Sequence, residues 1–189
     1  MPTTKSLLDE GYKARTEHRH DDAEAIYAAA VAQSRQANDP SLHAHCLKRL
    51  GGIKRDLGNT AAALDLYQQA VLIQRNLDDP LGLAHTIRHV ADILRESGQS
   101  SAALPHYEEA LSIYRHSAGT GTLDLANTLR GFALLKATLG ETRAAIMLWE
   151  EAGALYNQVW QEPGSAFTQV DLAPGIAESR RQIALLSKG

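Results

Sequence analysis

The sequence predicts an all-α fold, an α-solenoid of four helix–turn–helix repeats followed by a C-terminal capping helix. Three features of the 189 residues support this prediction. An alanine–aromatic–alanine pattern recurs, a small residue recurs upstream of it, and a glycine separates the two in three copies. Such regular recurrence indicates stacked units, because a single helix pair cannot bury its whole apolar face.

The alanine–aromatic–alanine pattern marks the second helix of each repeat, expected at about 21–37, 60–76, 101–116 and 142–159. Its copies are offset by 40, 40 and 42 residues and consist of Ala23, Tyr27 and Ala30; Ala63, Tyr67 and Ala70; Ala103, Tyr107 and Ala110; and Ala145, Trp149 and Ala152. Small residues let helix axes approach to the lower end of ~8–10 Å, so the aromatic stripe is interpreted as core. Thr60, Ser100 and Thr142 are expected as N-caps.

The first helices, at about 3–18, 40–56, 80–96 and 122–138, carry an apolar residue followed four residues later by a small one. The pairs are Leu7 and Gly11, Leu47 and Gly51, Ile87 and Ala91, and Leu129 and Ala133. This spacing places both residues on one helix face. Asp39–Pro40 and Asp79–Pro80 predict helix starts with an aspartate cap. Gly58, Gly98 and Gly140 predict left-handed helix ends, and His18 holds that place in the first repeat.

Four repeats are therefore expected at about residues 3–38, 40–78, 80–118 and 122–160, followed by a loop at 161–170. Residues 171–189 form a plausible amphipathic helix, with Pro174 near its start and Leu172, Ile176, Ile183 and Leu186 as its apolar residues. A terminal unit needs a polar outer face, so this segment is expected to be a capping helix. Trp160 and Phe167 are expected to cover the end of the fourth repeat; a contact between copies of the chain is the alternative.

The composition excludes several classes of protein. One cysteine allows no intrachain disulfide, and the N-terminus lacks the apolar run of a signal peptide. No stretch approaches ~18 uninterrupted apolar residues, so neither a membrane span nor a membrane partner is expected. A net charge of −3 argues against a nucleic-acid partner. We expect a cytoplasmic protein. No nucleophile–base–orienter set is visible, so we expect neither an enzyme nor a cofactor nor a catalytic residue.

These recurring residues resemble the tetratricopeptide repeat family over about residues 3 to 160. The resemblance rests on the small residues of the first helices, the glycines between helices, and the alanine–aromatic–alanine pattern. Two features differ. Leu7, Leu47, Ile87 and Leu129 replace the usual aromatic residue, and the period is 40 rather than about 34. The longer period is similar to that of kinesin light chains and bacterial peptide-sensing regulators. The resemblance implies a right-handed solenoid whose first helices line a concave groove.

Basic and polar residues recur at equivalent positions of the first helices, which the resemblance places in the groove. They are Lys48, Arg88 and Arg130; Arg15, Arg55 and Arg95; and His45, His85 and Asn127, with Asp92 four residues after Arg88. The four first helices sum to +4 and the four second helices to −4. Arginine can hold a carboxylate at two points, so this pattern favours an acidic peptide. The alternative is an ordinary solvated helix face whose arginines were copied by duplication.

The leading functional hypothesis is a non-catalytic scaffold that binds a protein or peptide partner, with a preference for acidic segments. The alternatives are a peptide or small-molecule sensor that acts through a partner, and a module for homo-oligomeric assembly. The family's two-carboxylate clamp needs an asparagine one turn after Lys48 or Arg88, where Gly52 and Asp92 stand, so it is not reproduced. His85 and His89 have the i, i+4 spacing of a metal pair, but groove polar residues are the preferred interpretation and no metal site is expected.

Overall fold

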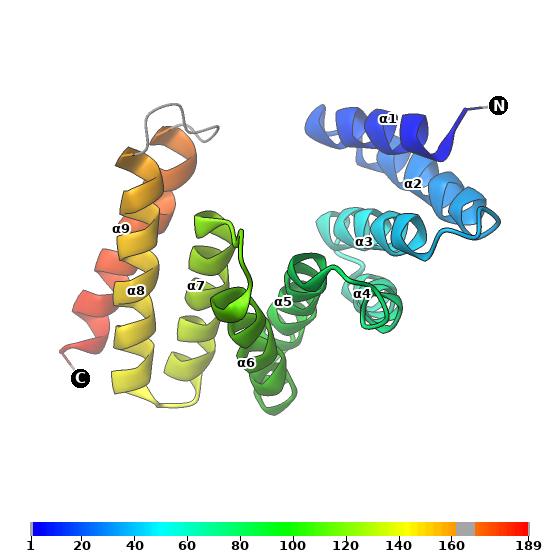
Figure 1. Ribbon diagram of the computed structural model, residues 1–189. Coiled ribbons are helices and arrows are strands. Elements are labelled where there is room, and N and C mark those ends of the chain that lie inside the picture. Colours follow the sequence, from blue (N-terminus) through cyan, green and yellow to red (C-terminus); the bar gives the residue numbers. More distant parts are fainter. Residues whose placement is uncertain (1, 162–168, 189) are drawn as a thin grey trace. The chain divides into compact units, whose positions relative to one another are not determined.

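The computed structural model describes residues 2–161 and 169–188 of the chain, which contain nine α-helices and no strand (Figure 1). The all-α prediction is therefore confirmed. The helices are α1 (Thr4–Thr16), α2 (His20–Ser34), α3 (Pro40–Asp56), α4 (Thr60–Gln74), α5 (Pro80–Glu96), α6 (Ser100–His116), α7 (Thr122–Thr138), α8 (Thr142–Gln161) and α9 (Gln169–Leu186).

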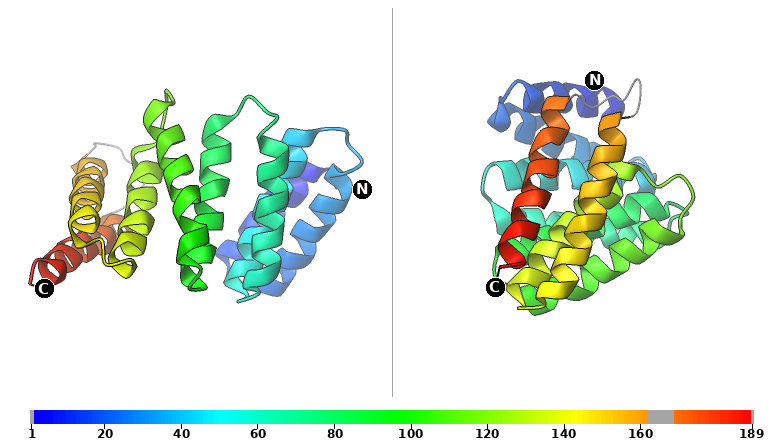
Figure 2. Two further views of the ribbon diagram at one scale, coloured as in Figure 1. Left: turned by 90° about the horizontal axis from the view of Figure 1, so that it is seen from below. Right: turned by 90° about the vertical axis from the view of Figure 1, so that its left-hand side faces the viewer.

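The helices belong to two compact units, residues 1–90 and 91–189, and the boundary lies within α5. In the first unit α1 packs on α2, α2 on α3, and α3 on α4. In the second unit α6 packs on α7, α7 on α8, and α8 on α9. Figure 2 shows α9 running beside α8. Consecutive helices are thus neighbours within each unit, as expected of a helical repeat.

The aromatic stripe lies in the core, as predicted. Tyr27, Tyr107 and Trp149 are 0% exposed and Tyr67 is 2% exposed. The first-helix glycines explain how the helices approach these rings. A Cβ built on Gly11 would lie 2.6 Å from Cε1 of Tyr27, which is closer than two carbon atoms can pack.

Two of the predicted helix starts are confirmed and three are wrong. The side chains of Asp39 and Asp79 accept hydrogen bonds from the backbone N–H groups of the third residue beyond each, Leu42 and Gly82. Thr60, Ser100 and Thr142 are instead the first helical residues of α4, α6 and α8. The cap of α4 is Asn59, whose side chain accepts from the N–H of Ala62, and Gln99 at the start of α6 makes no side-chain cap. The error has a physical cause. Helices α3 and α5 end where expected, and the residue directly after the left-handed glycine, Asn59 or Gln99, takes the cap position of the next helix.

The turns between paired helices take the predicted left-handed conformation. Gly58, Gly98 and Gly140 have φ angles of 77°, 73° and 76°. His18 occupies the equivalent place in the first repeat and adopts the same conformation, with a φ of 59°. A side chain disfavours this region because its Cβ approaches the following carbonyl oxygen. The first turn therefore carries backbone strain that the other three avoid.

Helix α9 packs on α8 at the end of the fourth repeat through two buried apolar residues and a glycine. Leu172 is 2% and Ile176 9% exposed, and a Cβ on Gly175 would lie 3.0 Å from the ring of Tyr156 in α8. Trp160 lines a small cavity with residues of α9, so its ring lies against the capping helix rather than apart from it. Helix α9 begins two residues before the expected position, and Phe167 lies outside the described residues.

Candidate functional site

In the first unit, histidines from α3 and α5 gather with basic side chains. The His89 ring stacks on the Tyr67 ring, with centroids 5.0 Å apart and planes at 15°. The His85 ring meets the edge of His89 at 4.7 Å. Nη2 of Arg88 lies 3.3 Å from Nε2 of His89. Because arginine can only donate, Nε2 accepts and the proton of a neutral His89 ring lies on Nδ1.

The same cluster includes His45, which accepts a hydrogen bond from Nε of Arg49 at 3.3 Å. Lys48 stands between these two residues in the sequence. Arg49 was not among the predicted residues. Its position is occupied by His89 in the next repeat, so no repeating charge marked it. We call His45, Lys48, Arg49, His85, Arg88 and His89 the α3–α5 cluster.

Burial and positive charge together keep the histidines of the α3–α5 cluster neutral. Burial, followed by the charge of Arg88 and then Lys48, lowers the pKa of His85 to about 3. Burial, Lys48 and Arg49 lower the pKa of His45 to about 4. The pKa of His89 is also lowered, by burial first and then by Arg88 and His85, with a contribution from Arg55. The leading charged neighbours of all three imidazoles are thus cations.

The Arg15 and Arg95 positions are paired within the protein. Nε and Nη2 of Arg15 donate to the two carboxylate oxygens of Asp56, at 2.6 and 3.2 Å. Burial alone would lower the pKa of Arg15, but the hydrogen bond and charge of Asp56 outweigh it and raise the pKa. Arg95 donates to the Tyr107 hydroxyl at 3.1 Å and pairs with Glu96 at 3.0 Å.

Asp92 belongs to this same network and is 7% exposed. The Tyr107 hydroxyl donates to Oδ1 of Asp92 at 2.6 Å. Burial and then the Asp92 carboxylate raise the pKa of Tyr107. Asp92 therefore orients a core tyrosine.

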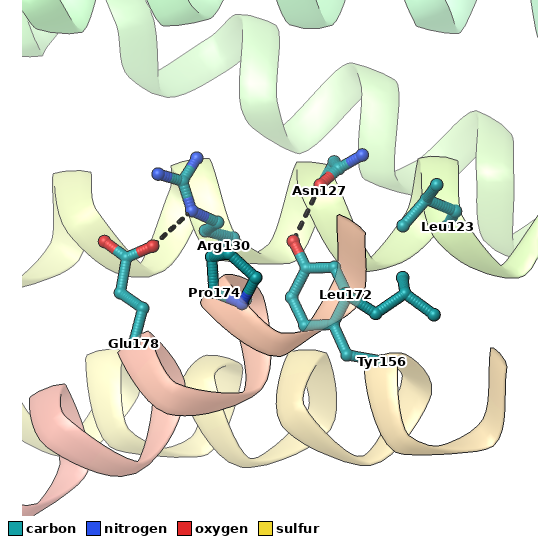
Figure 3. A pocket seen from close by; sticks show the side chains of 8 residues that line it. Leu123, Asn127, Arg130, Tyr156, Leu172, Pro174 and Glu178 are labelled. Carbon is teal, nitrogen blue, oxygen red and sulfur yellow. Dashed lines mark hydrogen bonds and ion pairs between the residues drawn. The ribbon is translucent and has the colours of Figure 1, made fainter. Parts of the chain in front are cut away.

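The second unit contains a cavity of about 400 Å³ between α7, α8 and α9 (Figure 3). We call it the α7–α9 cavity. Its lining combines the apolar side chains of Leu123, Leu172 and Pro174 with the polar side chains of Asn127, Arg130, Tyr156 and Glu178, together with Gly175 of α9. The Tyr156 hydroxyl donates to Oδ1 of Asn127 at 2.7 Å. Nε of Arg130 donates to Oε2 of Glu178 at 2.6 Å.

The charge state of Arg130 follows from these contacts. Burial would lower its pKa, but the hydrogen bond and charge of Glu178 outweigh burial and raise it. The ion pair is open to solvent, since the two side chains are 39% and 21% exposed. Such a partly exposed pair contributes little net stability by itself.

The sequence identified Asn127 and Arg130 but neither of the side chains that orient them. Tyr156 was not among the predicted residues. It follows Trp149 by seven residues, and the equivalent position is Tyr114 in the third repeat but Ser34 and Gln74 in the first two. Glu178 was not among the predicted site residues either. It lies 48 residues from Arg130, and no local spacing connects the two. This contact exists only because α9 packs back on α8.

The predicted cation positions thus fall into three settings. Lys48 and Arg88 lie in the α3–α5 cluster, and Arg55 contributes its charge there. Arg15 and Arg95 are paired with carboxylates, and Arg130 lines the α7–α9 cavity. Within the described residues, no group of three or more side chains is arranged to hold a metal ion, and no helix has the length and apolar character needed to cross a membrane.

Solved structures similar to this chain share its fold at low sequence identity. BtubC (BKLC) from P. vanneervenii aligns at 16% identity with a TM-score of 0.81, covering 97% of this chain and 71% of that one. A Podosopora anserina protein described as a kinesin light chain aligns at 15% with a TM-score of 0.73, covering 97% and 85%. The apo form of RapI aligns at 13% with a TM-score of 0.75, covering 96% of this chain and 47% of RapI.

Among curated protein sequences, none matches this chain. A family model does match it. The model described as "Tetratricopeptide repeat" covers residues 14–76 and 82–158, which include all four copies of the alanine–aromatic–alanine pattern. With the packing of consecutive helices and the buried aromatic stripe, this match identifies the repeats that the sequence predicted. The chain belongs to the tetratricopeptide repeat family.

Proposed function

We propose that this chain is a non-catalytic scaffold that binds a protein or peptide segment carrying acidic side chains. Tetratricopeptide repeat proteins generally mediate protein interactions, and the acidic preference is the specific part of this proposal. It is supported by one observation above all, the gathering of Lys48, Arg49 and Arg88 around the neutral imidazoles of His45 and His85.

The electrostatic argument is that cations of one sign, held near low-dielectric protein, attract an anion more strongly than isolated surface cations do. Burial is the first cause of the lowered pKa values of His45 and His85, so low-dielectric protein adjoins these cations. An acidic side chain arriving at the α3–α5 cluster would offset repulsion among these cations. It would also find arginine, which can hold a carboxylate with two parallel hydrogen bonds.

Fluorescence-polarisation binding to pooled acidic, neutral and basic peptides tests this proposal. The acidic pool should bind selectively, and its affinity should fall as salt is added. The variant Lys48→Glu/Arg88→Glu reverses two charges of the α3–α5 cluster and should abolish the acidic preference. The matched control is Lys5→Glu/Arg143→Glu, which makes the same net charge change at two exposed positions outside the cluster.

Comparison of the two variants separates a local site from a general charge effect. If both variants lose the acidic preference equally, the protein responds to net charge alone and the cluster is not the site. If neither loses it, the cluster is ordinary solvated helix surface. Loss in the cluster variant alone, with a retained far-ultraviolet circular dichroism spectrum, would support the proposal.

A further inference from the structure

We infer that the α7–α9 cavity is a carboxylate-binding site, which receives an acidic side chain together with an apolar neighbour from the same segment. The inference rests on the proposed function, because it names a second place on the chain where an acidic segment would bind. It depends on different residues, in residues 91–189, and can therefore fail separately. The argument begins with the hydrogen bonds of Asn127 and Arg130.

The two polar side chains of α7 are held in place from one side only. The amide oxygen of Asn127 accepts from the Tyr156 hydroxyl, so the amide nitrogen and its two N–H donors lie opposite. Arg130 uses Nε for Glu178, so both Nη groups remain. In Figure 3 the amide nitrogen of Asn127 and the terminal nitrogens of Arg130 point to the same side, away from α8 and α9.

These remaining groups are all N–H donors, which is the arrangement that a carboxylate needs. Asn127 and Arg130 are three residues apart on α7, a spacing that places them on one helix face. The guanidinium offers two parallel donors, and charge-assisted bonds of this kind are roughly twice as strong as neutral ones. Because Tyr156 and Glu178 already fix the two side chains, a ligand would lose less affinity to ordering them.

The apolar part of the cavity defines the second half of the ligand. Leu123 and Leu172 form an apolar wall beside Asn127, whereas Pro174 lies beside Arg130 (Figure 3). The volume of about 400 Å³ is at the small end of ligand cavities, roughly 300–1,000 Å³. It therefore suits a short part of a segment rather than a whole peptide. An acidic residue next to an apolar one would place its carboxylate on Asn127 and Arg130 and its apolar neighbour on this wall.

Glu178 sets the limit of this site. Its negative carboxylate lines the cavity and would repel a second carboxylate of the segment. The preferred ligand is therefore a single acidic residue beside an apolar one, not a run of acidic residues. In this respect the α7–α9 cavity differs from the α3–α5 cluster, where the leading charged neighbours are all cations.

Fluorescence polarisation with four labelled peptides of one polar frame tests the inference on the full chain. Three are acetylated and amidated and carry Leu-Glu, Leu-Gln or Ala-Glu at the centre. The fourth carries Leu-Gln and a free C-terminal carboxylate. Arg130→Gln should weaken Leu-Glu binding by about tenfold or more, as expected for loss of a hydrogen bond to a charged group, and leave Leu-Gln binding unchanged. Arg143→Gln, an exposed arginine on α8, is the matched control and should change neither.

Several results would overturn the inference. If Arg130→Gln weakens binding of the Leu-Glu and Leu-Gln peptides equally, the site does not recognise a carboxylate. Equal affinity of the Leu-Glu and Ala-Glu peptides would remove the apolar half of the site. Tight binding of the free-acid Leu-Gln peptide, lost on amidation, would assign the site to a chain terminus instead. Arg130→Lys, which keeps the charge but lacks the paired donors, should fall between wild type and Arg130→Gln. If Arg130→Gln does not fold, Arg130→Lys replaces it in this test.

The two sites fail in distinguishable ways. If Lys48→Glu/Arg88→Glu removes the acidic preference while Arg130→Gln has no effect, the cavity inference is wrong and the proposed function stands. If Arg130→Gln alone removes Leu-Glu binding, the cavity is the site and the α3–α5 cluster is not.

Discussion

Acidification should destabilise residues 1–90 through the partly buried histidines of the α3–α5 cluster. In the folded chain the pKa of His85 is about 3 and that of His45 about 4, against an ordinary value of 6.5. The unfolded chain therefore takes up protons first as the pH falls. Stability from these groups is complete above the unfolded pKa of 6.5 and decreases below it, until the folded pKa is reached. The window runs from about pH 6.5 down to pH 3–4.

The magnitude follows from these pKa values. About pH 5 lies 1.5 pH units below the unfolded value, and each unit corresponds to about 1.4 kcal/mol, so each of the two histidines should reduce the unfolding free energy by about 2 kcal/mol. His89 acts in the same direction, because its pKa is also lowered. A loss of about 2–4 kcal/mol is a large fraction of the ~5–15 kcal/mol typical of a folded domain.

Urea unfolding followed by far-ultraviolet circular dichroism, at a series of pH values between about 7.5 and 5, measures this effect. His85→Gln removes one of the three titrating imidazoles of the α3–α5 cluster and should flatten the pH dependence by about a third in this window. His116→Gln changes an exposed histidine on α6 and is the matched control. It should leave the slope unchanged.

An unfolding free energy that stays constant over this range would refute the reasoning. It would mean that the imidazoles are hydrated, or charged already, in the folded chain. A decrease that begins only below about pH 4.5 would assign the effect to carboxylates instead of histidines. If His85→Gln and the wild-type chain show equal slopes of unfolding free energy against pH, His85 does not contribute to the pH dependence.

Three further predictions concern packing, backbone strain and the cavity. Gly11→Ala places a Cβ 2.6 Å from the buried Tyr27 ring and should lower the free energy of unfolding by up to about 2 kcal/mol, even after the gain in helix propensity. In Gly51→Ala the Cβ lies 3.3 Å from the Tyr67 ring, so this variant should be as stable as the wild type or more stable. Equal urea midpoints for the two variants would contradict this prediction. His18→Gly relieves a φ of 59° and should stabilise by about 0.5–1 kcal/mol, and an unchanged midpoint would count against strain. Glu178→Gln keeps an acceptor for Arg130 but removes the negative charge, so acidic peptides should bind several-fold tighter in fluorescence polarisation while basic peptides bind no better.

The core and the helix pairing could be predicted from the sequence because they rest on repetition. The stripe of Tyr27, Tyr67, Tyr107 and Trp149 recurs with flanking alanines, and each copy reports the same packing. The N-caps were misplaced by one residue because Thr60 and the residue before it, Asn59, can both cap a helix. Only the conformation of the preceding glycine decides between them.

The candidate sites also contain features that the sequence could predict and features that it could not. The recurring positions of Lys48 and Arg88 led to the prediction of a cationic groove, and both residues are among the charges that lower the pKa values of His85 and His89. The sequence did not predict that Arg15 would be held by Asp56, forty-one residues away, or Arg130 by Glu178. An ion pair between distant residues leaves no periodic trace, since each partner alone resembles an ordinary solvated charge.

The sequence by itself determined an all-α chain, its buried aromatic stripe and its family. These properties depend on local spacing, repeated often enough to stand above chance. The tertiary structure alone decided which cations are paired inside the protein, which surround buried imidazoles, and how α9 closes a cavity over Asn127 and Arg130. The physical reason is that these hydrogen bonds and this burial depend on the distances between helices. Packing sets those distances, and the order of residues along a single helix does not specify them.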